Sequence, residues 1–118
     1  MRNVGAVWET VVEKHLLASG LRLIARNFTC RYGEIDLVMR DRDCTVFVEV
    51  RYRRSGLHGD GVLSVGASKR TKLLRTASIF LQSRAALSNT PCRFDVIGCR
   101  GAPQQPEFDW VRGAFETN

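Results

Sequence analysis

The feature of this sequence that most constrains its fold is a pair of runs rich in apolar and β-branched residues, separated by a short polar segment. The runs cover residues 34–39 and 45–52, and the segment between them, 40–44, reads RDRDC. Such runs favour strands and the polar segment favours a turn, so the stretch predicts a β-hairpin. A turn of two or of four residues gives the same register, in which Asp36 lies opposite Glu49.

Side chains alternate across a strand, so this hairpin is predicted to have one polar and one apolar face. The same register places Glu34 opposite Arg51, on the face that also carries Asp36 and Glu49. The other face is predicted to be core and consists of Ile35, Leu37, Met39, Val46, Val48 and Val50. An odd number of turn residues would instead put Asp36 and Glu49 on a diagonal.

Two directly opposed carboxylates are unfavourable unless something offsets their charge, since the Cβ atoms of opposed residues are only about 5 Å apart. A divalent cation such as Mg²⁺ or Mn²⁺ suits this arrangement, because it accepts carboxylate oxygens together with water and phosphate oxygens. The alternative interpretation is a solvated salt-bridge patch in which Arg51 pairs with Glu34. The hairpin alone leaves both interpretations open.

Composition indicates one globular domain, 1–118, with an excess of positive charge. The chain is 44% hydrophobic and 25% charged, and its net charge of +6 favours a polyanionic partner such as nucleic acid or an anionic membrane. Of these, nucleic acid is the expected partner, and no membrane is expected. No apolar run reaches the roughly 18 residues of a membrane span and the first residues do not resemble a signal peptide, so a cytoplasmic protein is expected. The four cysteines form no C-x-x-C pair, which favours reduced thiols over a zinc site.

The rest of the chain predicts an α/β fold in which a mixed central sheet is flanked by helices, in the order α-β-β-β-α-β-β. A first helix is expected over 4–19, between Asn3 as N-cap and Gly20, and a second from Ser68 as N-cap to about residue 87. Strands are expected at 21–29, 93–99 and 108–111, in addition to the hairpin. Residues 53–66 contain four glycines and are predicted to be a flexible loop.

Basic residues gather at the start of the second predicted helix, at Lys69, Arg70 and Lys72. Positive charge at a helix N-terminus opposes the helix dipole unless an anion compensates. One interpretation is that these side chains and the helix amides receive phosphates, and the other is an ordinary solvated basic face.

Several blocks of the chain resemble known families. An acidic residue on the first helix, Asp36, and then Glu49-Val50-Arg51 resemble the PD-(D/E)xK nuclease core. More specifically, GEIDL at 33–37, FVEV at 47–50, Lys69 and RFDVI at 93–97 resemble the uncharacterised bacterial YraN family, which is similar to archaeal Holliday-junction resolvases. The resemblance spans nearly the whole chain and implies a restriction-endonuclease-like core.

The resemblance also implies roles for individual residues. Asp36 and Glu49 match two carboxylates that bind Mg²⁺ or Mn²⁺, with the backbone carbonyl of Val50 as a further ligand. Glu9 matches a helix glutamate that orients the attacking water or completes the metal shell. Glu34 belongs to the family's GEID block, but no role is established for it there.

Arg51 departs from the superfamily pattern, which has lysine at this position. Lysine can steer the nucleophile and shift its pKa when buried, whereas arginine keeps its charge and cannot act as a base, although its planar fork binds phosphate well. The substitution therefore preserves phosphate affinity and puts cleavage in question.

Three hypotheses follow. The first is a metal-dependent nuclease acting on nucleic acid, DNA in preference to RNA, whose backbone is tracked by Arg53, Arg54, Lys69, Arg70 and Lys72. The second is a catalytically impaired DNA- or RNA-binding module that uses the same surface. The third is a basic scaffold that binds another protein. Resemblance to dimeric resolvases implies a homodimer.

Overall fold

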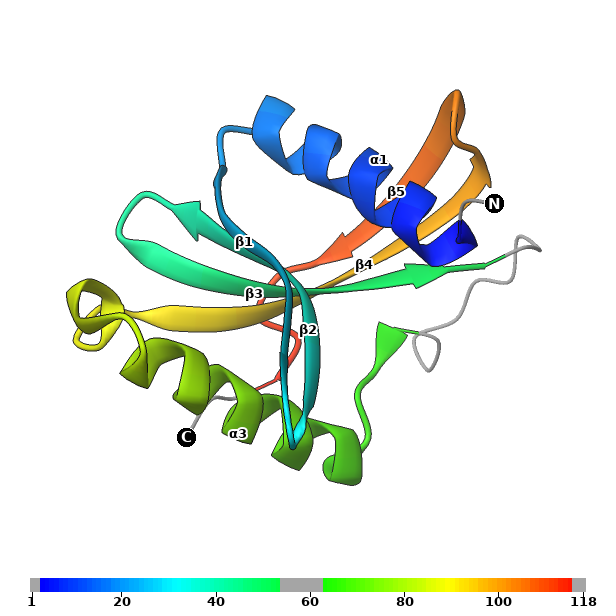
Figure 1. Ribbon diagram of the computed structural model, residues 1–118. Helices are drawn as coiled ribbons and strands as arrows, with labels where there is room; N and C mark the ends of the chain where they lie inside the picture. The colour runs from blue at the N-terminus through cyan, green and yellow to red at the C-terminus, as the bar shows by residue number, and fades with distance from the viewer. Residues whose placement is uncertain (1–2, 54–62, 116–118) are drawn as a thin grey trace.

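The computed structural model describes residues 3–53 and 63–115, and shows a twisted sheet with one long helix on each side (Figure 1). Arg54 and most of the loop predicted at 53–66 lie outside these ranges. The helices and strands are α1 (Val4–Ala18), β1 (Arg22–Cys30), β2 (Gly33–Asp41), β3 (Cys44–Tyr52), α3 (Ala67–Gln82), β4 (Cys92–Ala102) and β5 (Gln105–Val111), with a short 3-10 helix, η1 (Ala85–Leu87). The predicted order of helices and strands is confirmed.

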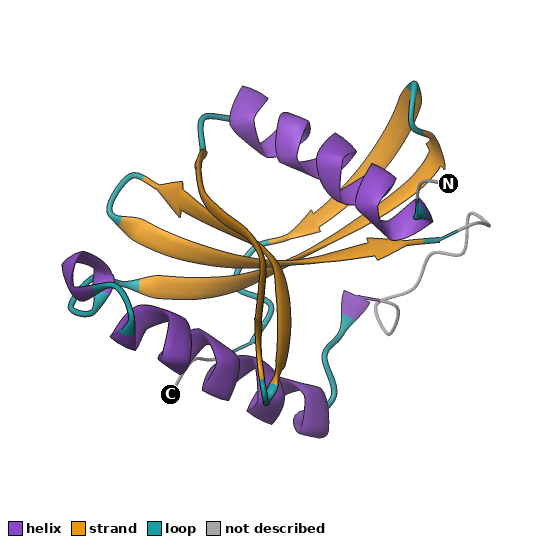
Figure 2. Cartoon of the chain, in the orientation of Figure 1, coloured by secondary structure: helices purple, strands orange, loops and turns teal. Residues whose placement is uncertain are grey.

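The five strands form one mixed sheet in chain order, β1-β2-β3-β4-β5. The β3–β4 pair is parallel and the other three pairs are antiparallel. A parallel pair needs a crossover connection, and α3 lies within the segment that joins β3 to β4. The sheet is thus sandwiched between α1 on one face and α3 on the other (Figure 2), which confirms the predicted α/β class.

The first helix begins and ends where the sequence predicts. The Asn3 side chain accepts a hydrogen bond from the Gly5 amide at 2.8 Å, and Gly20 takes a left-handed φ of 99° just beyond the helix. The buried stripe of α1, Trp8, Val12 and Leu16, packs against β2, β3 and β4.

The second helix differs from its predicted bounds at both ends. Its N-cap is Gly66, which is extended and whose carbonyl accepts from the Arg70 amide at 2.9 Å, so Ser68 lies inside the first turn rather than capping it. The helix ends at Gln82 instead of near residue 87, because Arg84 leaves the helical region at φ −133° and ψ 88°. Neither α1 nor α3 has the length and apolar character of a membrane-spanning helix within the described part of the chain.

The last two strands are longer than predicted. Gly101, at φ 85°, and Pro106 lie opposite each other near the β4–β5 turn, and the sequence reads as a loop there because both residues are unfavourable in a central strand. Since β5 is an edge strand, Pro106 is tolerated and the pairing extends to Ala102 and Gln105.

The register predicted for the hairpin is confirmed over residues 37–41 and 44–48, with Leu37 paired to Val48 and Met39 to Val46. The predicted pairs Asp36–Glu49 and Glu34–Arg51 lie beyond this stretch and are not among the paired residues of the described strands. The predicted faces need one correction, because Ile35 packs in the core beneath α3 while Leu37 packs beneath α1. Regular pairing stops at Leu37, so strict alternation no longer holds at the preceding residues. Both faces of the hairpin are therefore buried over most of its length.

Candidate functional site

Five of the charged residues singled out from the sequence, Glu34, Asp36, Glu49, Lys69 and Lys72, line one surface cleft with a volume of about 460 Å³. The sheet contributes Tyr32, Gly33, Glu34, Asp36 and Glu49, and α3 contributes Ser68, Lys69, Lys72, Leu73 and Thr76. We call this the acidic cleft. It forms where β2 and β3 begin to separate and where the first half of α3 crosses them.

Asp36 lies at the point of separation between the two strands. Its Oδ2 accepts a hydrogen bond from the Val50 amide at 2.8 Å, in place of regular pairing between the strands. Burial raises the pKa of Asp36 to about 7, and the charges of Glu49, Glu9 and Glu34 add to this rise, against the lowering effect of the Val50 amide. Asp36 therefore exchanges its proton near neutral pH.

Glu49 is nearly buried, with 11% of its side chain exposed, and lies between two cations. Its Oε2 is 2.6 Å from Lys69 Nζ and 3.5 Å from Arg51 Nη2. The same buried oxygen accepts no hydrogen bond with acceptable geometry from the described residues, so the Lys69 contact is an ion pair only. Such an oxygen is only partly satisfied by its surroundings.

The salt-bridge interpretation was wrong in its pairing. Arg51 lies beside Glu49, as above, and its Nη1 donates to the Ser64 carbonyl at 2.7 Å. Glu34 instead accepts a hydrogen bond from Asn27 at 3.1 Å.

Asn27 is the site residue that sequence reasoning missed. Its amide nitrogen donates to Glu9 at 2.9 Å as well as to Glu34, and so ties α1 to β2 beside Asp36. In the β1–β2 ladder, Arg26 pairs with Leu37 and Phe28 with Ile35, so Asn27 lies opposite Asp36. Its backbone has a left-handed φ of 51°, a conformation that asparagine tolerates better than most residues. An asparagine inside a predicted strand was the available signal.

The other predicted residues lie at different distances from the cleft. Lys69 and Lys72 line it, while Arg70 is exposed on α3 and is not among the lining residues. Arg53 follows β3, and its amide donates to the Cys99 carbonyl at 2.9 Å. The Val50 amide, rather than its carbonyl, makes the contact with Asp36.

The donor set of the cleft fits a hard divalent cation in its chemistry. The carboxylates of Glu49, Glu9 and Glu34 are close enough to raise the pKa of Asp36, and a buried Glu49 oxygen lacks a hydrogen bond among the described residues. Within residues 3–53 and 63–115, however, no three His, Cys, Asp or Glu side chains converge as a ready-made metal site. A metal bound through Glu49 Oε2 would compete with Lys69 and Arg51 for that oxygen.

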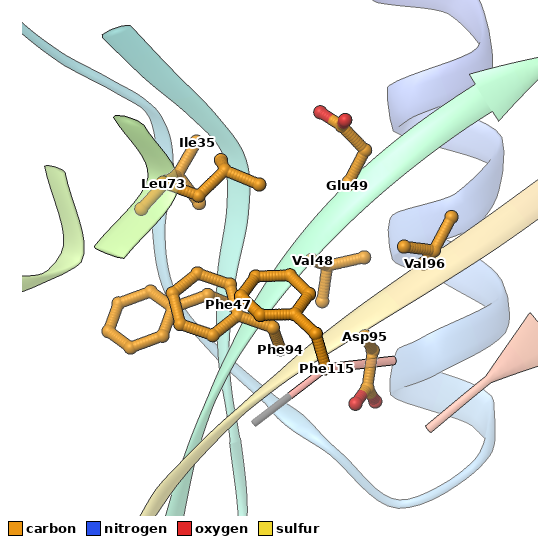
Figure 3. A pocket seen from close by; sticks show the side chains of 9 residues that line it. All are labelled: Ile35, Phe47, Val48, Glu49, Leu73, Phe94, Asp95, Val96 and Phe115. Atoms are coloured by element: carbon orange, nitrogen blue, oxygen red, sulfur yellow. The ribbon is translucent and has the colours of Figure 1, made fainter. Parts of the chain in front are cut away.

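A second, much smaller space beneath Glu49 is part of the core. It measures about 10 Å³, room for at most one water, and Ile35, Leu73 and the rings of Phe47, Phe94 and Phe115 line it. Figure 3 shows the Glu49 carboxylate pointing away from these rings. The aromatic packing supports the strand that presents Glu49 and does not form a ligand site.

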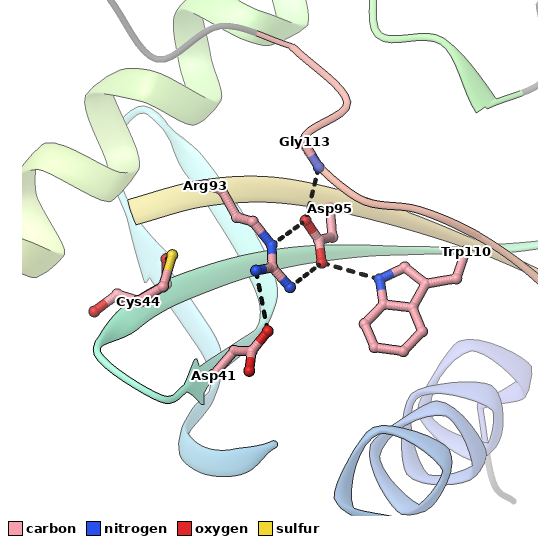
Figure 4. Close-up of polar contacts among 7 residues, drawn as sticks. Asp41, Cys44, Arg93, Asp95, Trp110 and Gly113 are labelled. Carbon is pink, nitrogen blue, oxygen red and sulfur yellow. Dashed lines mark hydrogen bonds and ion pairs between the residues drawn. The ribbon is translucent and has the colours of Figure 1, made fainter. Parts of the chain in front are cut away.

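The RFDVI block has a structural role in this fold. Asp95 is buried and accepts hydrogen bonds from Arg93 Nε at 3.0 Å, Trp110 Nε1 at 2.9 Å and the Gly113 amide at 3.0 Å (Figure 4). Arg93 also bonds Asp41 at 3.1 Å. The network ties β5 and the β2–β3 turn to β4, and none of its side chains lines the acidic cleft.

Comparison with known proteins gives close relatives of unassigned activity. The family model described as "Uncharacterised protein family UPF0102" matches residues 8–99. A UPF0102 protein of Stutzerimonas stutzeri is 47% identical over 98% of this chain and 97% of its own length. UPF0102 protein YraN of Salmonella arizonae is 47% identical over 99% of this chain and 87% of its own.

A solved structure with much lower sequence identity also matches this chain. "The structure of Pyrococcus Furiosus SfsA in complex with Ca2+" aligns with 92% of this chain and 62% of that chain, at 12% identity and a TM-score of 0.39.

Proposed function

We propose that this chain, which belongs to the uncharacterised protein family UPF0102, is a metal-dependent nuclease that hydrolyses phosphodiester bonds in nucleic acid. The observation that carries the proposal is the position of Asp36, whose pKa of about 7 reflects burial beside three other carboxylates. A group so perturbed, in a cleft lined by Lys69 and Lys72, is typical of a functional site.

Asp36 and Glu49 would hold Mg²⁺ or Mn²⁺ in this proposal, with Glu9 and the Val50 carbonyl as further donors. When bound, the cation supplies positive charge that activates water for attack and offsets negative charge on the phosphate. Loss of the Asp36 proton would accompany binding. Asn27 would hold Glu9 and Glu34 in position through its two hydrogen bonds.

The cations of the cleft supply the phosphate-binding part of the proposal. Lys69, once released from Glu49, and Lys72 from the next turn of α3 would face the substrate backbone across the cleft. Arg51, held by Ser64, would bind the scissile phosphate with a fixed charge. Arg53, Arg54 and Arg70 would extend this basic surface. DNA in preference to RNA, and a homodimer, come from the resemblance to resolvases and stay predictions.

A second candidate is a protein that binds nucleic acid without cutting it. The ion pairs of Glu49 with Lys69 and Arg51 favour this second candidate, because a carboxylate that two cations already neutralise needs no metal. Arginine in place of the superfamily lysine points the same way, since arginine does not act as a base.

A cleavage assay separates the two candidates. Labelled branched and single-stranded DNA would be incubated with the wild-type protein, Asp36→Asn and Arg51→Lys, in Mn²⁺ and in EDTA. The proposal expects cleavage by the wild type that needs Mn²⁺ and is reduced at least about a hundredfold in Asp36→Asn. The matched control Asp109→Asn, in an exposed ion pair with Arg100, should cut as the wild type does.

The other outcomes are equally specific. Cutting by Arg51→Lys alone would support the binding module, with a cation site that the natural residue does not use for cleavage. No cutting by any variant, with tight DNA binding, would contradict the nuclease proposal outright.

A further inference from the structure

A second cleft lies at the opposite end of α3 from the acidic cleft. It has a volume of about 780 Å³ and is lined by Ile24, Arg40, Ser83, Arg84 and the three residues of η1. We call this the arginine cleft. It lies where the start of β1 and the end of β2 meet the turn that follows α3, so the β1–β2 ribbon crosses α3 between the two clefts (Figure 1).

Positive charge in the arginine cleft has no acidic counterpart. Arg40 is paired directly with Arg22 in the β1–β2 register, and like charges in opposed positions are destabilising. None of Arg22, Arg40 and Arg84 is within ion-pair distance of a carboxylate in the described ranges. Asp41, next to Arg40 in sequence, is bound by Arg93 on the other side of the turn.

The two arginines that line this cleft are held in place but not satisfied. Arg40 Nε donates to the Arg42 carbonyl at 3.0 Å, while its Nη1 is buried and has no hydrogen-bond partner among the described residues. The Arg84 guanidinium lies 5.1 Å from the centre of the Phe80 ring. The buried nitrogen raises the cost of holding the Arg40 charge without a counter-ion, and an anion bound in the cleft would offset the charge of both guanidinium groups.

We propose that the arginine cleft is a second contact for the phosphate backbone of a nucleic acid that also enters the acidic cleft. Lys72 lines the acidic cleft and Arg84 lines the arginine cleft, and the 12 residues between them along α3 correspond to about 18 Å at about 1.5 Å per residue. That length corresponds to about 5 base pairs of duplex at about 3.4 Å each. The inference rests on the proposed function for its ligand, nucleic acid, and is independent of whether the acidic cleft cuts.

The test measures binding alone, in EDTA, by fluorescence anisotropy between 50 and 200 mM KCl, a range over which phosphate contacts weaken steeply. The probes are DNA hairpins with stems of about 20 and about 4 base pairs, the shorter being unable to span about 18 Å. Arg40→Gln/Arg84→Gln is compared with Arg112→Gln, a control that removes an exposed arginine stacked on Trp110. Ala86→Glu adds negative charge to the cleft wall while keeping both arginines.

For the long stem, the double variant should bind about ten- to a hundredfold more weakly at 100 mM salt, and its salt slope should fall by about 2. For the short stem the loss should be at most about twofold, because either cleft can bind it alone. Ala86→Glu should weaken the long stem in the same direction. The inference is overturned if the salt slope is unchanged, or if Arg112→Gln has the same effect as the double variant.

This outcome is separable from that of the cleavage assay. Loss of long-stem binding in the arginine variants, with no cleavage by the wild type, would retain the second contact and reject the nuclease. Cleavage by the wild type, with unchanged binding in the arginine variants, would retain the nuclease and reject the second contact.

Discussion

At the scale of single residues, the site depends on the balance of charge around Asp36. Its carboxylate is buried near those of Glu49, Glu9 and Glu34, and the Val50 amide is the one hydrogen-bond donor found for it among the described residues. Burial and like charge both favour the protonated form, which is why its pKa rises to about 7. The folded protein therefore holds a proton that the unfolded chain has already released above about pH 4.

This proton makes stability depend on pH with a definite sign. The contribution of Asp36 is fully present below its unfolded pKa of about 4 and is lost as the pH rises toward about 7, because the native state binds the extra proton. Asp36→Asn has no carboxyl group to ionise and so avoids this loss of stability at high pH. We expect the variant to be more stable than the wild type by about 1–3 kcal/mol at pH 8, and the two proteins to be nearly equal in stability at pH 4. Urea unfolding in EDTA at the two pH values measures the difference. If the difference in unfolding free energy between Asp36→Asn and the wild type were the same at pH 4 and pH 8, Asp36 would not titrate in this way.

The sequence predicted some of these residue positions and missed others. The pairing of β2 with β3, and hence the closeness of Asp36 and Glu49, follows from side-chain alternation and turn length, which are local. The Asn27 bridge and the Lys69–Glu49 pair depend on how α1 and α3 cross the sheet, which no local pattern specifies. Ile35 was assigned to the wrong face because alternation fails where the strands separate.

At the scale of helices and strands, the ends of α3 differ most from expectation. A serine near the start of a helical pattern is a strong cap signal, yet Gly66 provides the first carbonyl and Ser68 remains inside. The result is that Lys69 and Lys72 lie in the first two turns of the helix and line the acidic cleft. At the other end, α3 stops at Gln82, earlier than predicted, and Arg84 lines the same cleft as Arg40.

Strand β4 is the anchor for the elements on the far side of the sheet. The Asp95 side chain is fully buried and bonds Arg93, Trp110 and Gly113. Asp95→Ala leaves the Arg93 guanidinium, an indole and an amide without their shared acceptor, so we expect a loss of about 3–5 kcal/mol in the free energy of unfolding. Asp109→Asn, in an ion pair whose Asp109 side chain is 49% exposed, should lose less than about 1 kcal/mol.

Denaturant titrations of both variants test this difference. Because no side chain of the network lines the acidic cleft, Asp95→Ala should keep the metal affinity of the wild type wherever it remains folded. Equal destabilisation by the two variants would mean that Asp95 contributes no more than a surface ion pair.

At the scale of the whole molecule, the topology gathers charges that the sequence keeps far apart. Glu9 comes from α1, Asn27 from β1, Asp36 from β2, Glu49 from β3 and Lys69 from α3. The α/β class and the order of the elements could be predicted, because apolar periodicity and turn signals mark each element. The crossing of the two helices over the sheet comes from long-range packing, and the charges of the site meet only through it.

The central claim is that Asp36 and Glu49 form a site for a divalent cation, and calorimetric titration of Mn²⁺ tests it most directly. Repeating the titration in buffers of different ionisation enthalpy gives the number of protons released. With a pKa of about 7, Asp36 is about nine-tenths protonated at pH 6, so about 0.9 proton should be released per Mn²⁺ there and about 0.1 at pH 8. Asp36→Asn should bind Mn²⁺ at least about tenfold more weakly, with no such proton release. Equal affinity and equal proton release in the two proteins would contradict the claim and leave the carboxylates a structural role only.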